Sequence, residues 1–179
     1  MIPALAMAAI LMAGPFWSAG CGSNSSSDTS QGGTKADSGS ERFVLKDIYN
    51  KNYKWSDLLG HPFIINFWAT WCGPCRREIP DMELVYEDYQ PKGLEIIAIS
   101  LDDARTVDRV PAFADRYKIP WPVLYGNEKV VREFNLGNSI PTTLFFDAEG
   151  NEVSRFVGAQ PELVFRRELA KLFAQSPQI

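Results

Sequence analysis

Histidine and cysteine, the usual ligands of structural zinc, are scarce in this sequence, which has a single histidine, His61, and only three cysteines. Two of the cysteines stand together as Cys72 and Cys75. A structural zinc site takes four ligands, and neither a second cysteine pair nor a histidine pair is available to complete one. His61 lies in a Gly-His-Pro turn, where we expect a surface residue without a chemical role. The sequence therefore predicts neither a metal nor another cofactor.

Positive charge is also in short supply. Lysine and arginine number 18 against 22 aspartates and glutamates, which leaves a net charge of -4. The chain has no basic run beside its N-terminus that could bind an anionic membrane surface. Nucleic-acid binding depends on clustered cations that neutralise phosphates. We therefore expect the protein neither to bind nucleic acid nor to bind a membrane surface through a polybasic patch.

The first 20 residues have no charged side chain and are mostly small or apolar, which is typical of a signal peptide. The stretch Ser18-Ala19-Gly20-Cys21, at the end of this segment, resembles a bacterial lipoprotein processing box. Cys21 is thus predicted to carry a lipid and to anchor the protein to a membrane. Because Ser18 stands where leucine is usual, a plain secretory signal and an uncleaved anchor remain alternatives.

The segment from Gly22 to Ser40 contains almost no apolar side chains, so it cannot offset the entropy of ordering by burial. We interpret it as a flexible linker with a reach of roughly 25 Å. The predicted organisation is a signal peptide over 1–20, a lipidated cysteine and linker over 21–41, and one folded domain over 42–176. With one cysteine assigned to lipid and two to a reactive pair, no structural disulfide is expected.

The rest of the chain alternates between strand-like and helix-like patterns. Strands are predicted at 43–45, 53–55, 63–68, 94–100, 122–125, 140–147 and 152–156, and helices at 72–89, 107–117, 128–134 and 161–173. Pro80 is expected to kink the first of these helices. This order predicts an α/β fold with a central mixed sheet flanked by helices, preceded by a short β-hairpin.

Cys72-Gly73-Pro74-Cys75 follows directly on the apolar stretch that is predicted as a buried strand. A helix beginning at Cys72 would direct its free N–H groups and the positive end of its dipole at that sulfur, favouring the nucleophilic thiolate. We expect Cys72 to be the more exposed, attacking thiol and Cys75 the sheltered, resolving thiol. Gly73 and Pro74 add no charge to the pair, which favours a reducing couple.

Three motifs carry a family resemblance: Asn66 to Cys75, Arg76 to Pro80, and Ile140 to Thr143. On these motifs the chain resembles the TlpA/ResA-like family of thioredoxin-fold, membrane-tethered thiol-disulfide oxidoreductases. The resemblance implies a thioredoxin-like sandwich with an N-terminal hairpin and an inserted helix and strand over 107–125. It also implies a periplasmic reductase of protein disulfides that is re-reduced by a transmembrane thiol donor. Apocytochrome c is one substrate candidate, through cytochrome c maturation.

Glu78 lies three residues after Cys75, on the same side of the predicted helix, and the family has an active-site glutamate at this spacing. The resemblance implies that Glu78 moves protons, because thioredoxin has a buried aspartate where this chain has Asn66. The alternative is a solvated glutamate paired with Arg76 or Arg77.

The family also implies that Pro141 is preceded by a cis peptide bond and faces the cysteine pair, which leaves the Ile140 backbone free to pair with an extended substrate. The alternative is an ordinary trans proline turn. Trp71 is expected to shield the dithiol and to offer an apolar docking face, with Gly73 and Pro74 beside it.

Related folds also serve two other functions. Copper delivery would use the cysteine pair with a further histidine or methionine, and it remains the alternative function. A peroxidase of the peroxiredoxin type would need proline and threonine where Ile65 and Ala69 stand, so it is not expected. Thr142 stands where one branch of cytochrome-maturation proteins has a glutamate after the proline, which disfavours that branch.

Overall fold

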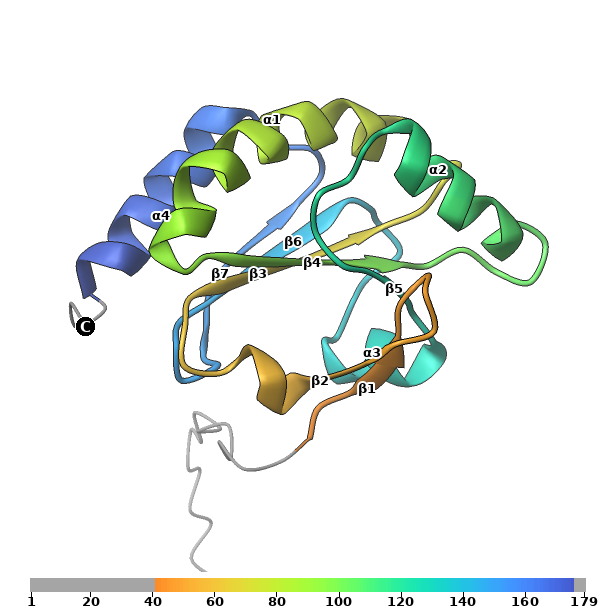
Figure 1. The fold of residues 1–179 in the computed structure, drawn as a ribbon, viewed down its shortest axis with the longest axis horizontal. Helices are drawn as coiled ribbons and strands as arrows, with labels where there is room; N and C mark the ends of the chain where they lie inside the picture. The colour runs from red at the N-terminus through yellow and green to blue at the C-terminus, as the bar shows by residue number, and fades with distance from the viewer. Residues whose placement is uncertain (1–40, 176–179) are drawn as a thin grey trace, which may run out of the picture. The chain divides into compact units, whose positions relative to one another are not determined.

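The structure is a computed structural model that describes residues 41–175. Its main sheet has five strands in the order β5-β4-β3-β6-β7, with β3, β4 and β5 parallel and β6 and β7 antiparallel to their neighbours (Figure 1). The strands are β3 (Phe63–Trp68), β4 (Glu95–Ser100), β5 (Val123–Tyr125), β6 (Thr142–Phe146) and β7 (Glu152–Val157). The predicted α/β class with a mixed sheet is confirmed.

A separate two-stranded sheet precedes it. The strands β1 (Val44–Lys46) and β2 (Asn52–Lys54) pair antiparallel and form the predicted hairpin. The hairpin is attached to the main fold near β5, because the Ile48 N–H donates to the Val123 carbonyl oxygen at 3.0 Å. The 3-10 helix η1 (Trp55–Leu58) then leads into β3.

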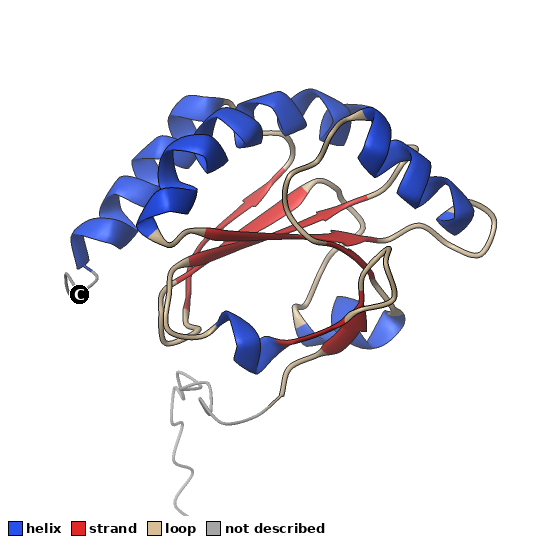
Figure 2. Cartoon of the chain, viewed as in Figure 1, coloured by secondary structure: helices blue, strands red, loops and turns tan. Residues whose placement is uncertain are grey.

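Helices cover both faces of the main sheet (Figure 2). The helices α1, α2 and α4 lie on one face, while α3 lies with the hairpin on the other (Figure 1). Their bounds are α1 (Gly73–Tyr89), α2 (Val110–Arg116), α3 (Glu128–Glu133) and α4 (Glu162–Gln175), with 3-10 helices η2 (Gln90–Lys92) and η3 (Val107–Arg109). Each predicted helix is present. The helix predicted over 107–117 begins as the 3-10 turn η3. The helix α1 continues through Pro80 without a break.

The strand β3 is buried along its whole length, so its alternating side chains fill two cores. Ile64 and Trp68 belong to the core beneath α1 and α4. Phe63 and Phe67 belong to the core beneath η1 and α3, where Phe63 stacks on Phe146 with ring centroids 4.8 Å apart. This double burial fixes the carboxyl end of β3, from which the loop to α1 departs.

Within residues 41–175, no helix is both long and apolar enough to cross a membrane. The predicted signal peptide, Cys21 and nearly all of the predicted linker lie outside the described residues. Their assignments stay predictions.

Candidate active site

Cys72 and Cys75 form a disulfide at the start of α1, with an S–S distance of 2.03 Å. Cys72 is the N-cap residue, and its sulfur accepts a hydrogen bond from the Cys75 backbone N–H at 3.2 Å. Pro74 lies in the first helical turn, where a missing N–H leaves no helical bond unmade. The N-terminal end of a helix favours negative charge on a nearby group. A thiolate on Cys72 would therefore be stabilised when the disulfide is opened.

The loop before β6 lies against the Cys72 sulfur. The Ile140 carbonyl oxygen is 3.6 Å from the Cys72 Sγ atom, and the Ile140–Pro141 peptide bond is cis, as predicted. The Gly158 N–H donates to the Pro141 carbonyl oxygen at 2.8 Å, which ties this loop to the end of β7. The predicted juxtaposition of proline loop and cysteine pair is present in the structure.

The expected difference in exposure between the two sulfurs is not present. Cys72 is 3% exposed and Cys75 is 2% exposed, so both are buried. The close approach of the Ile140 carbonyl covers Cys72 in the disulfide form. The prediction of a more exposed Cys72 is wrong for this state, and exposure alone does not identify the attacking thiol.

Glu78 lies one helical turn after Cys75 and is 1% exposed. Its Oε1 atom accepts from the Gln160 backbone N–H at 2.9 Å, and its Oε2 atom accepts from the Asn66 amide nitrogen at 3.1 Å. The amide nitrogen also donates to the Thr143 hydroxyl oxygen at 2.9 Å. The alternative of a solvated glutamate paired with an arginine is therefore wrong.

Burial raises the pKa of Glu78 to about 7. The hydrogen bonds from the Gln160 N–H and the Asn66 amide act in the opposite direction, and the charge of Asp81 adds to the rise. A carboxyl group that titrates near neutral pH can both accept and return a proton under ordinary conditions. This property distinguishes Glu78 from an ordinary surface glutamate.

Arg76 and Arg77 bring their guanidinium groups close to Gly73. Their guanidinium nitrogens lie 3.8 and 3.9 Å from the position that a Cβ atom would take at Gly73. Among residues 41–175 neither arginine forms an ion pair with a carboxylate. Two cations therefore face the segment between the cysteines, a feature that the sequence analysis did not anticipate.

A second polar cluster holds the loop that leads into α1. The Asp102 carboxylate accepts from the Thr70 N–H at 2.8 Å, the Thr70 hydroxyl at 2.5 Å and the Ser100 hydroxyl at 2.8 Å. Thr70 stands two residues before Cys72, so Asp102 fixes the backbone that positions the reactive sulfur. Trp71, which lies between Thr70 and Cys72, is 58% exposed, and its role as a docking face stays a prediction.

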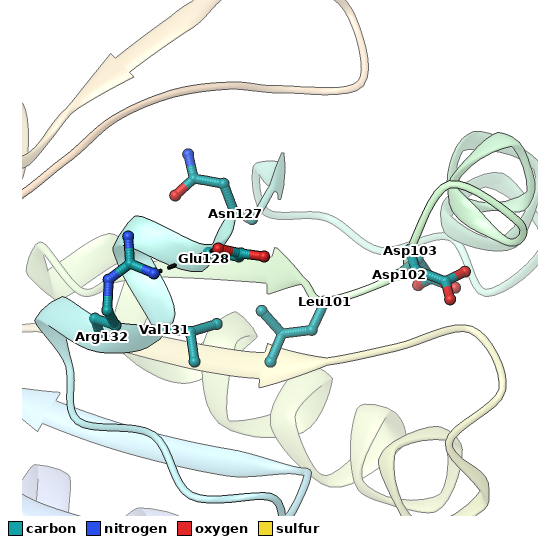
Figure 3. A pocket seen from close by; sticks show the side chains of 8 residues that line it. Leu101, Asp102, Asp103, Asn127, Glu128, Val131 and Arg132 are labelled. Carbon is teal, nitrogen blue, oxygen red and sulfur yellow. Dashed lines mark hydrogen bonds and ion pairs between the residues drawn. The ribbon is translucent and has the colours of Figure 1, made fainter.

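Asp102 also borders a cavity of about 420 Å³ between the end of β4 and the start of α3. In Figure 3 the side chain of Leu101 lies between the two aspartates and the ion pair of Glu128 with Arg132, and Val131 lies below that ion pair. In the part of the chain that the structure describes, no group of three histidine, cysteine, aspartate or glutamate side chains is arranged to hold a metal ion.

The sequence matches the AhpC/TSA family over residues 38–153. It is 34% identical over 131 residues to thiol-disulfide oxidoreductase ResA of Bacillus thuringiensis (strain Al Hakam), covering 73% of this chain and 74% of that protein. It is 32% identical over 120 residues to thiol-disulfide oxidoreductase ResA of Bacillus subtilis (strain 168), covering 67% and 66%.

Solved structures of thioredoxin-like proteins are also similar to this chain. A thiol:disulfide interchange protein of the thioredoxin family from Chlorobium tepidum TLS superposes with a TM-score of 0.66 at 30% identity, covering 73% of this chain and 92% of that one. A thioredoxin-like protein from Porphyromonas gingivalis superposes with a TM-score of 0.64 at 30% identity, covering 75% and 92%. The chain therefore belongs to the AhpC/TSA family of thioredoxin-fold proteins and, within it, is a ResA-like thiol-disulfide oxidoreductase.

Proposed function

We propose that this oxidoreductase reduces disulfides in other proteins outside the cytoplasm. The observation that carries the proposal is the Cys72–Cys75 disulfide at the start of α1, with the buried Glu78 one turn further along the same helix. This arrangement combines a reversible dithiol with a proton acceptor that titrates near neutral pH.

In the proposed reaction, the Cys72 thiolate attacks one sulfur of a substrate disulfide, and the other substrate sulfur leaves as a thiolate. A mixed disulfide between Cys72 and the substrate results. The Cys75 thiol then gives its proton to the Glu78 carboxylate and attacks the Cys72 sulfur, which releases the second substrate thiolate. The proton returns from Glu78 to a departing thiolate. The substrate gains two electrons, and the enzyme is left as the disulfide seen here.

The reducing direction is supported by the sequence between the cysteines. Gly73 and Pro74 bring no charged side chain into the pair, in contrast to strongly oxidising couples whose thiolate is highly stabilised. The positive charges of Arg76 and Arg77 act in the opposite direction, because they stabilise the thiolate of the reduced pair. Both side chains are exposed, so solvent and salt screen these charges. We assign the couple a potential close to that of thioredoxin-like reductants.

Substrate binding is assigned to the surface around the sulfurs. Trp71 offers an exposed aromatic face, and Gly73 and Pro74 let a partner approach closely. The Ile140 backbone, before Pro141, is available to pair with an extended substrate segment in the manner of an added strand.

The proposed location follows from the N-terminal sequence. Residues 1–20 would be removed as a signal peptide, Cys21 would carry the lipid, and the chain up to residue 41 would let the domain over 42–176 move near the membrane. A transmembrane thiol donor would then re-reduce the pair. Apocytochrome c is the substrate that we propose, through cytochrome c maturation.

The proposal is tested by turnover of a disulfide-bearing protein with dithiothreitol as the electron source. Cys72→Ser and Cys75→Ser should each abolish turnover, while Glu78→Gln should slow it and change its pH profile. Glu87→Gln is the matched control, because Glu87 is an exposed glutamate on the same helix. If Glu78→Gln and Glu87→Gln have equal rates between pH 5 and 9, the proton-transfer role of Glu78 is wrong.

A further inference from the structure

The side-chain amide of Asn66 lies between a carboxylate oxygen of Glu78 and the hydroxyl oxygen of Thr143. Asn66 is a buried residue of β3, 6% exposed, and it pairs in register with Thr143 of β6. Its amide nitrogen donates to the Glu78 Oε2 atom at 3.1 Å and to the Thr143 hydroxyl oxygen at 2.9 Å. The amide group has two N–H hydrogens, so both are used.

This arrangement fits the ionised form of Glu78, because a carboxylate can only accept hydrogen bonds. When the proton is on Oε2, the resulting O–H group must donate, and the amide nitrogen at that position cannot accept from it. A half-turn of the Asn66 amide exchanges its nitrogen for its oxygen at the same place. The oxygen can then accept from the Glu78 O–H and from the Thr143 hydroxyl, since a hydroxyl serves as donor or acceptor.

We propose that Asn66 is a positioning residue whose amide turns over when Glu78 gains or loses its proton, with Thr143 exchanging the direction of its hydrogen bond. The inference rests on the proposed role of Glu78 as the proton acceptor for Cys75. When the Cys75 thiol passes its proton to Glu78, a thiolate and a carboxylic acid result. No other covalent bond changes, and the amide turn satisfies the new O–H group.

The other groups around Glu78 do not provide this exchange. The Gln160 backbone N–H, from the connection between β7 and α4, donates to Oε1 and has no acceptor to offer in its place. Asp81, on the same helix, contributes a negative charge that raises the pKa of Glu78. Cys75 is the thiol that exchanges the proton. The pairing of Asn66 with Thr143 is therefore the part of the surroundings that can serve both protonation states.

The residue type matters for this role. Leucine at position 66 would offer no hydrogen bond to either form of Glu78. Aspartate would place a second carboxyl group within hydrogen-bond distance of the first, and two such groups resist joint ionisation. Asparagine alone among these three adds no charge and presents both a donor and an acceptor.

The test follows the oxidised Cys21→Ser protein by NMR between pH 5 and 9, so that no thiol titrates. The Glu78 side-chain carboxyl carbon reports its protonation, and the Asn66 side-chain amide reports its own environment. We expect both to change with one midpoint, and Glu78→Gln to remove the change at Asn66. The amide of Asn52, exposed on β2, is the reference and should stay constant. An Asn66 amide that is constant while Glu78 titrates would overturn the proposal.

Variants supply a second measurement. Asn66→Leu should raise the Glu78 midpoint by roughly one pH unit, because a hydrogen bond to the charged form is lost. Asn66→Asp should raise it further. Thr143→Ser keeps the hydroxyl and should leave the midpoint within a few tenths of a unit, whereas Thr143→Val should move it. An unchanged midpoint in Asn66→Leu contradicts the inference. Because these readouts use no substrate, they are separate from the turnover test of the proposed function.

Discussion

Replacing Glu78 by glutamine should change how the stability of the oxidised protein depends on pH. The pKa of Glu78 is about 7 in the folded protein and 4.5 in an unperturbed chain. Below pH 4.5 the group is protonated in both states, so it adds no pH dependence. Between these values folding takes up a proton, so stability falls as the pH rises. Above pH 7 the loss is complete and amounts to about 3 kcal/mol.

Glutamine cannot titrate, so Glu78→Gln should escape this loss. The assay is urea unfolding of both oxidised proteins at a series of pH values from 4 to 8.5. Other groups titrate alike in both proteins, so the difference between the two unfolding free energies isolates Glu78. We expect that difference to shift in favour of the variant by about 3 kcal/mol from pH 4 to pH 8.5. Parallel curves would refute the assignment of a raised pKa to Glu78.

Three further predictions concern other parts of the chain. Asp102→Ala should lower the unfolding free energy by about 2 kcal/mol, because the buried donors of Thr70 lose their acceptor. Asp103→Ala, at the exposed neighbouring residue, should lower it by less than about 0.5 kcal/mol. Thermal denaturation compares the two variants. Glutathione titration of the active-site disulfide should give a potential of about -250 mV, and a value of about -120 mV would contradict the reducing direction. Palmitate should label the wild-type protein but not Cys21→Ser, and equal labelling would remove the lipid assignment.

The sequence predicted the order of strands and helices because burial imposes clear periodicities on this chain. β3 is apolar apart from Asn66, and the strands that flank it are also largely apolar, so few alternatives fit. The position of the cysteine pair at the strand-to-helix junction followed from that order. The cis bond before Pro141 was predicted only through the family resemblance, since spacing carries no such information.

Other parts of the site could not be predicted from local pattern. The spacing of Glu78 from Cys75 places it on a helix face, but its burial depends on Gln160, which is 82 residues away in the chain. Likewise Thr143 reaches Asn66 only through the pairing of β3 with β6. The Cys72 sulfur meets the Ile140 carbonyl oxygen across 68 residues of the chain, which is a tertiary contact as well.

The central claim is that Cys72 attacks the substrate and Cys75 resolves the mixed disulfide. The most direct test uses the reduced variants Cys75→Ser and Cys72→Ser, each combined with Cys21→Ser so that one thiol remains, reacts them with the same disulfide-bearing protein and follows the covalent adduct by intact mass. Our account predicts that Cys75→Ser forms a stable adduct through Cys72, while Cys72→Ser forms it far more slowly. A faster or equal adduct through Cys75 would contradict the account.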